Sequence, residues 1–166
     1  MVLTDADDVD SLPASLLALA AQISRQRGRD DATPEAGPWT VTLELPCFLP
    51  FLQHSNRRDL REKLYRAFIS RASDGDLDNG PVIVEILRLR AEKAHLLGFE
   101  TFAQVSLSRK MAREVSAATN LLEELRDAAR QAGERDLREI KQLAGEAGAP
   151  EGQDGGEGFA QWDVFY

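Results

Sequence analysis

The sequence has little of several features that mark large classes of protein. Its single cysteine, Cys47, excludes an internal disulfide framework and fits a reducing compartment. It has two histidines, His54 and His95, and the HExxH spacing of many zinc enzymes does not occur. No apolar run approaches the roughly 20 residues that span a bilayer. These absences argue against a disulfide-rich secreted protein and a membrane protein.

An excess of positive charge is also missing. The net charge of −8 argues against a nucleic-acid partner, because phosphates require a basic face. The first ten residues carry four aspartates and no basic side chain, unlike a secretory signal or a transit peptide, so the predicted location is the cytoplasm. Residues 57–71 are the basic exception. Such arginine-rich helices most often form internal ion pairs, and we prefer that interpretation to an anionic partner.

The patterns that are present predict a mainly α-helical array with at most one short extended segment. The apolar spacing, the proline positions and the helix-ending glycines predict helices at 13–27, 57–73, 81–97 and 113–147. Residues 39–45 alternate apolar and polar side chains, as in a strand, and Pro46 and Pro50 are expected to break the chain after them. The apolar stripe of the last helix shifts after Gly133, which predicts an αα-hairpin or a kink there.

Two of these helices, 57–73 and 81–97, are apolar over most of their circumference. A surface helix needs only one apolar stripe, so helices of this kind require neighbours on several sides. We therefore expect unusual exposure in this chain and self-association through the uncovered faces. The residues concerned are Val82, Ile83, Ile86, Leu87 or Leu97, with some of Tyr65, Phe68 and Ile69.

No residue pattern supports a catalytic, cofactor-binding or metal site. A hydrolytic zinc site needs about three protein ligands, and His95 lies on the polar arc of its helix while His54 belongs to a helix start. Cys47 lies among prolines and apolar residues, which favours burial over nucleophilic activation. Alternating acids in residues 74–78 lack the central glycine and closing glutamate of a calcium loop. We assign no site residue and expect no zinc in this chain.

Three segments carry a family resemblance. They read WTVTLELPCFLPFLQHSNRRDLREKLYRAFISRAS (39–73), DNGPVIVEILRLRAEKAHLLGFETFAQVSLSRKMA (78–112) and QWDVFY (161–166). The TLELP segment, the LREKLYRAF helix, the DN turn before ILRLRAEKAHLLGF, the KMA segment and the WD-aromatic end resemble the thimet oligopeptidase and oligopeptidase A family of zinc metallopeptidases. The likeness runs from about residue 12 to residue 166.

The resemblance implies a larger helical, two-lobed enzyme that binds zinc and cleaves short peptides in a deep channel. In that family the HExxH helix and the downstream glutamate ligand follow the WD segment, so neither can be placed here. The expectation is a scaffold and channel-wall fragment at 1–148, a flexible glycine-rich linker at 149–158 and the start of a further helix at 159–166. An organellar parent enzyme stays open. The alternative is a stand-alone helical interaction module without catalytic activity.

Overall fold

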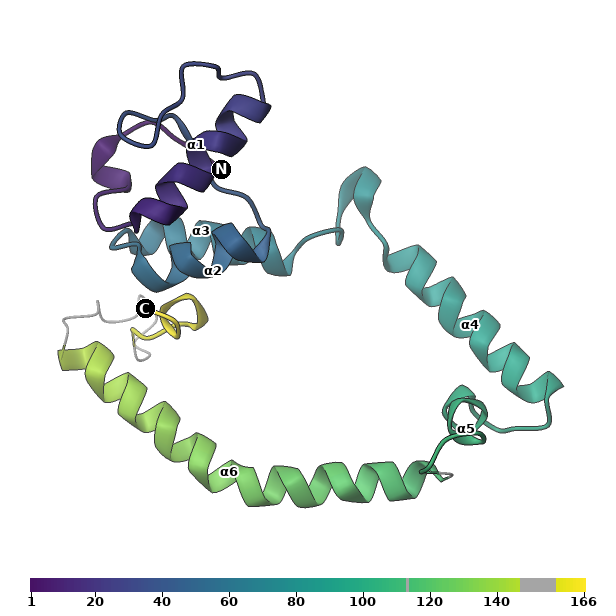
Figure 1. Ribbon diagram of the computed structural model, residues 1–166. Helices are drawn as coiled ribbons and strands as arrows, with labels where there is room; N and C mark the ends of the chain where they lie inside the picture. Colours follow the sequence, from purple (N-terminus) through teal and green to yellow (C-terminus); the bar gives the residue numbers. More distant parts are fainter. Residues whose placement is uncertain (113, 147–157) are drawn as a thin grey trace. The chain divides into compact units, whose positions relative to one another are not determined.

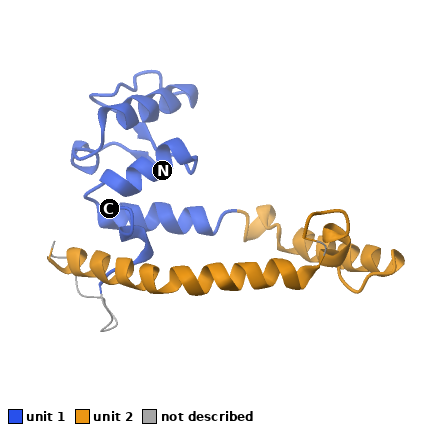
Figure 2. Cartoon of the chain, turned by 60° about the horizontal axis from the view of Figure 1, so that its bottom comes forward, with its two compact units in different colours: residues 1–71, 148–166 blue, residues 72–147 orange. Residues whose placement is uncertain are grey.

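The computed structural model describes residues 1–112, 114–146 and 158–166, and the fold is mainly α-helical, as predicted. The chain divides into two compact units, residues 1–71 with 148–166 and residues 72–147 (Figure 2). No helix in the described ranges combines the length and the apolar character needed to cross a bilayer. Each unit is described by itself below.

The first unit contains three α-helices (Figure 1) and a small antiparallel sheet. In the sheet, Val2 lies opposite Thr40 and Leu3 lies opposite Trp39. The extended segment predicted at 39–45 is therefore present but covers two residues only. The elements are β1 (Val2–Leu3), η1 (Ala6–Asp8), α1 (Ala14–Gln26), β2 (Trp39–Thr40), α2 (Leu45–His54), α3 (Arg58–Ile69) and η3 (Gln161–Asp163).

The core of this unit lies between α1, α2, α3 and the sheet. Phe51 and Leu52 of α2 are completely buried, and Trp39 and Val41 lie beside them in the same apolar cluster. A buried hydrogen bond of 2.7 Å joins the hydroxyl groups of Ser24 on α1 and Thr40 on β2, so these two polar groups satisfy each other. The other members of the core are Leu3, Val9, Leu12, Leu16, Ala20, Ala21, Cys47, Phe48 and Leu64.

Helix α2 corrects the expectation that two prolines would break the chain. Pro46 lies in the first turn, where its missing N–H would have no helical partner anyway. Pro50 lies inside the helix and removes one hydrogen bond, a defect that usually bends or ends a helix. The helix persists because one face buries Cys47, Phe48, Phe51 and Leu52 in the core. Tertiary packing has outweighed the local preference.

The second unit contains η2 (Gly75–Leu77), α4 (Gly80–Leu96), α5 (Phe102–Leu107) and α6 (Val115–Glu146). Pro81 opens α4, and Thr101 begins α5 with a capping box that it shares with Gln104. Helix α6 continues as one helix across Gly133, so the αα-hairpin, one of the two alternatives expected there, is wrong. A mid-helix glycine costs only about 1 kcal/mol, and same-helix ion pairs such as Arg130–Glu134 at 2.9 Å help to offset it.

The predicted exposure of apolar residues is confirmed. Ile83 is 54% exposed and Leu87 is 58% exposed, and Val82, Ile86 and Leu97 are exposed as well. Ile69 of α3 is exposed, whereas Tyr65 and Phe68 are half-buried. Among residues 72–112 and 114–146, Ala94 alone is fully buried. The self-association expected from these faces stays a prediction.

The division into scaffold, linker and further helix also stays a prediction. The linker expected at 149–158 lies outside the described residues, except for Gly158. In the segment that follows, Gln161–Asp163 form the short 3-10 helix η3.

Candidate functional site

A dense set of polar and aromatic contacts lies where α3 meets residues 158–166, here called the C-terminal segment. Successive turns of α3 place Arg58, Arg61 and Tyr65 toward this segment, since residues three and four apart share a helix face. From the segment come Trp162, Asp163 and Tyr166. We call these six residues the arginine–aspartate cluster.

Asp163 is the centre of the cluster. Its Oδ2 accepts from Nε and Nη2 of Arg58 at 3.1 and 2.9 Å, and its Oδ1 accepts from Nη2 of Arg61 at 2.8 Å. The backbone N–H of Ala160 donates to Oδ2 as well, at 3.0 Å. Burial alone would raise the pKa of Asp163, but the hydrogen bonds from Arg58, Arg61 and Ala160 together place it below its ordinary value. The carboxylate therefore stays charged at neutral pH.

Arg61 is 4% exposed, which is rare for an arginine. Its Nη1 donates to the carbonyl oxygen of Ser55 at 2.6 Å, and its guanidinium lies 3.9 Å from the centre of the Tyr166 ring. The Tyr166 hydroxyl in turn donates to Oδ1 of Asn56 at 2.7 Å. Arg61 Nε has no hydrogen-bond partner. A buried cation of this kind depends on its carboxylate, because an unpaired buried charge is costly.

Trp162 occupies the other side of the cluster. The guanidinium groups of Arg58 and Arg66 lie 5.6 and 5.0 Å from the centre of its ring, and the Tyr65 ring lies 6.0 Å away. These are distances at which a cation is attracted to an aromatic face. The Tyr65 hydroxyl also donates to the side-chain oxygen of Gln161. The indole N–H of Trp162 is buried without a partner.

This arrangement is suited to holding a peptide segment rather than to proton transfer. A general acid or base works best with a pKa near the operating pH, whereas the lowered pKa of Asp163 keeps it ionised. Planar guanidinium groups that meet a carboxylate and stack on aromatic rings are typical of recognition. The basic strip on α3 thus serves internal ion pairs, as predicted. Arg57 also pairs with Asp8 and Asp59, and Arg66 pairs with Glu62.

The residues considered for metal chemistry lie apart from this cluster. His54 is exposed in the last turn of α2 rather than at the expected helix start, and His95 is exposed in the last turn of α4 in the second unit. Cys47 is buried in the apolar core. In the acidic loop before α4, Asp78 Oδ1 accepts from the backbone N–H of Gly80 at 2.7 Å, which is a helix-start contact. In the part of the chain that is described, no three His, Cys, Asp or Glu side chains could together hold a metal ion.

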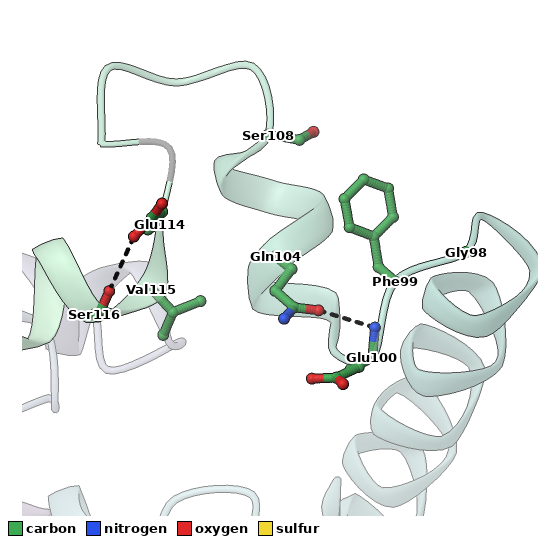
Figure 3. A pocket seen from close by; sticks show the side chains of 8 residues that line it. All are labelled: Gly98, Phe99, Glu100, Gln104, Ser108, Glu114, Val115 and Ser116. Atoms are coloured by element: carbon green, nitrogen blue, oxygen red, sulfur yellow. Dashed lines mark hydrogen bonds between the residues drawn. The ribbon is translucent and has the colours of Figure 1, made fainter.

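The second unit has an open hollow of about 540 Å³ between the end of α4, α5 and the start of α6 (Figure 3). Gln104 Oε1 accepts from the backbone N–H of Glu100 at 2.9 Å, and Ser116 donates to Glu114 at 3.4 Å. Two carboxylates, Glu100 and Glu114, line the hollow. Gln104 is engaged in capping α5, and the hollow suggests no specific chemistry.

Comparison with known proteins identifies the family. The family model of peptidase family M3 matches residues 51–166. The chain belongs to peptidase family M3. It is 44% identical over 165 residues to organellar oligopeptidase A, chloroplastic/mitochondrial, of Arabidopsis thaliana, covering 99% of this chain and 20% of the relative. It is 43% identical to the probable cytosolic oligopeptidase A of the same plant, again over 99% of this chain and 23% of the relative.

A bacterial oligopeptidase is also similar to nearly the whole chain. Oligopeptidase A of Salmonella typhimurium is 35% identical over 170 residues, which cover 99% of this chain and 23% of that protein. The chain thus spans about a fifth of the length of the curated relatives it matches. The resemblance to the thimet oligopeptidase and oligopeptidase A family is confirmed, and the relatives are peptidases.

The M3 motifs have a spatial relation that sequence reasoning missed. The LREKLYRAF segment lies on α3 and the WD pair lies in η3, and they meet in the arginine–aspartate cluster. A signal was present, because Arg58 and Arg61 are spaced to share one helix face and the C-terminal segment offers an acid between two aromatic residues. Nothing in the spacing, however, linked residues about 100 positions apart.

The zinc of M3 metallopeptidases does not fit the residues described here. Both histidines are exposed helix-end residues in different units, and the thiol is enclosed by apolar side chains. A catalytic zinc site needs about three such ligands converging with an open position for water. No catalytic step can be derived from this chain's described residues through the metal.

Proposed function

We propose that this chain is the scaffold and channel-wall region of a zinc-dependent oligopeptidase that cleaves short peptides. In this proposal the zinc ligands and the general base belong to other parts of the enzyme. The observation that carries the proposal is the similarity to oligopeptidases along 99% of the chain, although the match spans only about a fifth of their length.

The exposed apolar faces support a scaffold role. A few hundred Å² of uncovered apolar surface forgoes several kcal/mol at about 25 cal/mol per Å², which is comparable with the whole stability of a domain. Helix α4 exposes such side chains along its length, including Ile83 and Leu87. A larger enzyme body would cover them. The cytoplasm is the proposed location, and the relatives named as cytosolic and as chloroplastic/mitochondrial leave an organellar parent as the alternative.

A chimera tests the proposal. The aligned 165 residues of the probable cytosolic oligopeptidase A of Arabidopsis thaliana are replaced by this chain. Hydrolysis of a quenched fluorescent short peptide is then measured with and without chelator. We expect a folded chimera whose kcat/KM lies within about tenfold of the parent, equivalent to about 1.4 kcal/mol in the barrier. A folded, zinc-loaded chimera without activity would reject the scaffold role.

The isolated chain provides the matching control. We expect the purified chain to bind zinc no better than an adventitious surface site and to hydrolyse no peptide. Hydrolysis that a chelator abolishes and zinc restores would contradict this expectation directly.

The second candidate is a stand-alone helical interaction module. The closed core of the first unit favours it, because Phe51, Leu52 and their neighbours are buried without a further chain. A monomer that unfolds cooperatively at a high temperature and ignores a hydrophobic dye would favour this module. Self-association or strong dye binding would favour the scaffold.

A further inference from the structure

The contacts of the C-terminal segment are concentrated on one helix face. Arg58 Nη2 donates to the carbonyl oxygen of Gly158 at 2.7 Å, and the same guanidinium engages Asp163. Three further positions of the segment contact α3 or the residues just before it, namely Gln161, Trp162 and Tyr166. The segment is thus bound through its backbone at one end and through its side chains along its length.

The receiving face has a strong charge preference. Asp163 is the carboxylate that pairs with both Arg58 and Arg61, and its side chain is 8% exposed. Without it, two guanidinium groups one turn apart on α3 would repel each other while partly desolvated. An uncharged residue at this position of the segment would not relieve that repulsion. The face therefore selects an acid.

The receiving face also has an aromatic preference on both sides of the acid. Trp162 lies within 5.0 to 5.6 Å of two guanidinium groups, and Tyr166 is stacked 3.9 Å from a third. The hydroxyl of Tyr166 adds a hydrogen bond to Asn56 that phenylalanine could not make. Cation–aromatic contacts gain in strength when they are shielded from water. Together they define a spacing of Trp, Asp, two further residues and Tyr.

The receiving face is held in place by its own unit. Arg61 is fixed by the carbonyl oxygen of Ser55, which is itself buried, and Arg66 is held by Glu62 at 2.7 Å. Leu64 anchors α3 in the core. Side chains that are already ordered lose less entropy when a ligand binds, so the face has the properties of a preformed site.

We propose that this α3 face is a peptide-recognition site for acidic–aromatic segments of the form Trp-Asp-x-x-Tyr, which it binds whether or not they are joined to the chain. In the structure its ligand is the chain's own C-terminal segment. The proposal is independent of peptidase activity, since it concerns binding within the first unit alone.

The test uses the full chain with its own segment disabled. A variant carrying Trp162→Ala, Asp163→Asn and Tyr166→Ala loses the three main contacts while α3 is unchanged. A fluorescein-labelled peptide with the sequence of residues 158–166 is then titrated in, and its anisotropy is followed. A matched peptide differs only by asparagine at the position of Asp163. We expect the acidic peptide to bind at least about tenfold more tightly than its amide counterpart, with affinity falling as salt rises.

Two further measurements keep the test decisive. Adding Arg58→Lys to the receptor should reduce the preference for the acidic peptide, because lysine cannot form the two-pronged contact. The acidic peptide should also raise the thermal midpoint of the receptor, and this readout applies even if the variant is only marginally folded. Equal binding of both peptides, or no binding together with no change in the midpoint, would overturn the proposal.

Discussion

The two units of this chain differ in where their apolar side chains lie, buried in the first and largely exposed in the second. In the first unit, three helices and a two-stranded sheet enclose a core in which Phe51 and Leu52 have no exposed surface. In the second, Ala94 alone is fully buried among the described residues, and Ile83, Leu87 and Leu122 face outward. The first unit is therefore stabilised chiefly by its buried core, whereas the second has little buried apolar surface and is held by same-helix ion pairs and by contacts such as Arg90 against the Phe102 ring. Mutations should separate these two sources of stability.

The largest expected effect is in the core of the first unit. Phe51→Ala leaves a cavity among completely buried side chains and should destabilise this unit by about 4 kcal/mol. Amide hydrogen exchange should show faster opening in α1 to α3, with little change in α4 to α6. The matched control is Leu122→Ala, at a side chain that is 66% exposed, which should change stability by less than about 0.5 kcal/mol. Equal losses of stability in the two variants would contradict the difference in packing between the two units.

The next effect concerns the arginine–aspartate cluster. Asp163→Asn leaves two partly buried guanidinium groups without a countercharge and should cost about 3 kcal/mol. Asp59→Asn is the control, because its carboxylate pairs with Arg57 at the surface, where an ion pair contributes at most about 1 kcal/mol. Urea unfolding of both variants measures the difference. Similar losses of stability in the two variants would show that burial does not decide how much an ion pair contributes here.

Acid should reproduce the effect of that substitution. The pKa of Asp163 is lower in the folded chain than in the unfolded chain, so the carboxylate stabilises the fold above its unfolded pKa of about 4. This contribution is lost as the pH falls through the lower, folded value. We expect the indole NMR signal of Trp162 to move to its unbound position below about pH 4. In the Asp163→Asn variant the Trp162 signal should be at this unbound position already at pH 7. It should not move further as the pH falls.

The smallest effects come from two glycines and have opposite signs. Gly37 has φ +68°, and a Cβ there would lie 2.7 Å from the Trp39 ring, so Gly37→Ala should destabilise the first unit by about 1 to 3 kcal/mol. Gly133 lies within α6 with nothing within 4 Å of an added Cβ, so Gly133→Ala should stabilise the helix by about 0.5 to 1 kcal/mol. Circular dichroism melts of both variants test the signs, and a stabilising Gly37→Ala would contradict this account of the first unit.

Much of the helical architecture could be predicted from local spacing. The ends expected at 13–27 and 81–97 lie within one or two residues of α1 and α4, because proline starts and glycine stops are local signals. Helix α2 could not be predicted in this way, since it forms through burial of its apolar face despite Pro50. The pairing of Arg61 with Asp163 could not be predicted either, because it depends on how the chain returns to α3.

The long separation of Arg61 and Asp163 in the sequence has a consequence for synthesis of the chain. Arg61 and Asp163 are separated by 102 positions. At about 5 to 20 residues per second, a ribosome needs about 5 to 20 s to travel from one to the other. Helix α3 and the core beneath it can assemble during that interval, while both guanidinium groups remain hydrated and without their carboxylate. The last contacts of the first unit to form during translation are thus made only after the whole second unit has been synthesised.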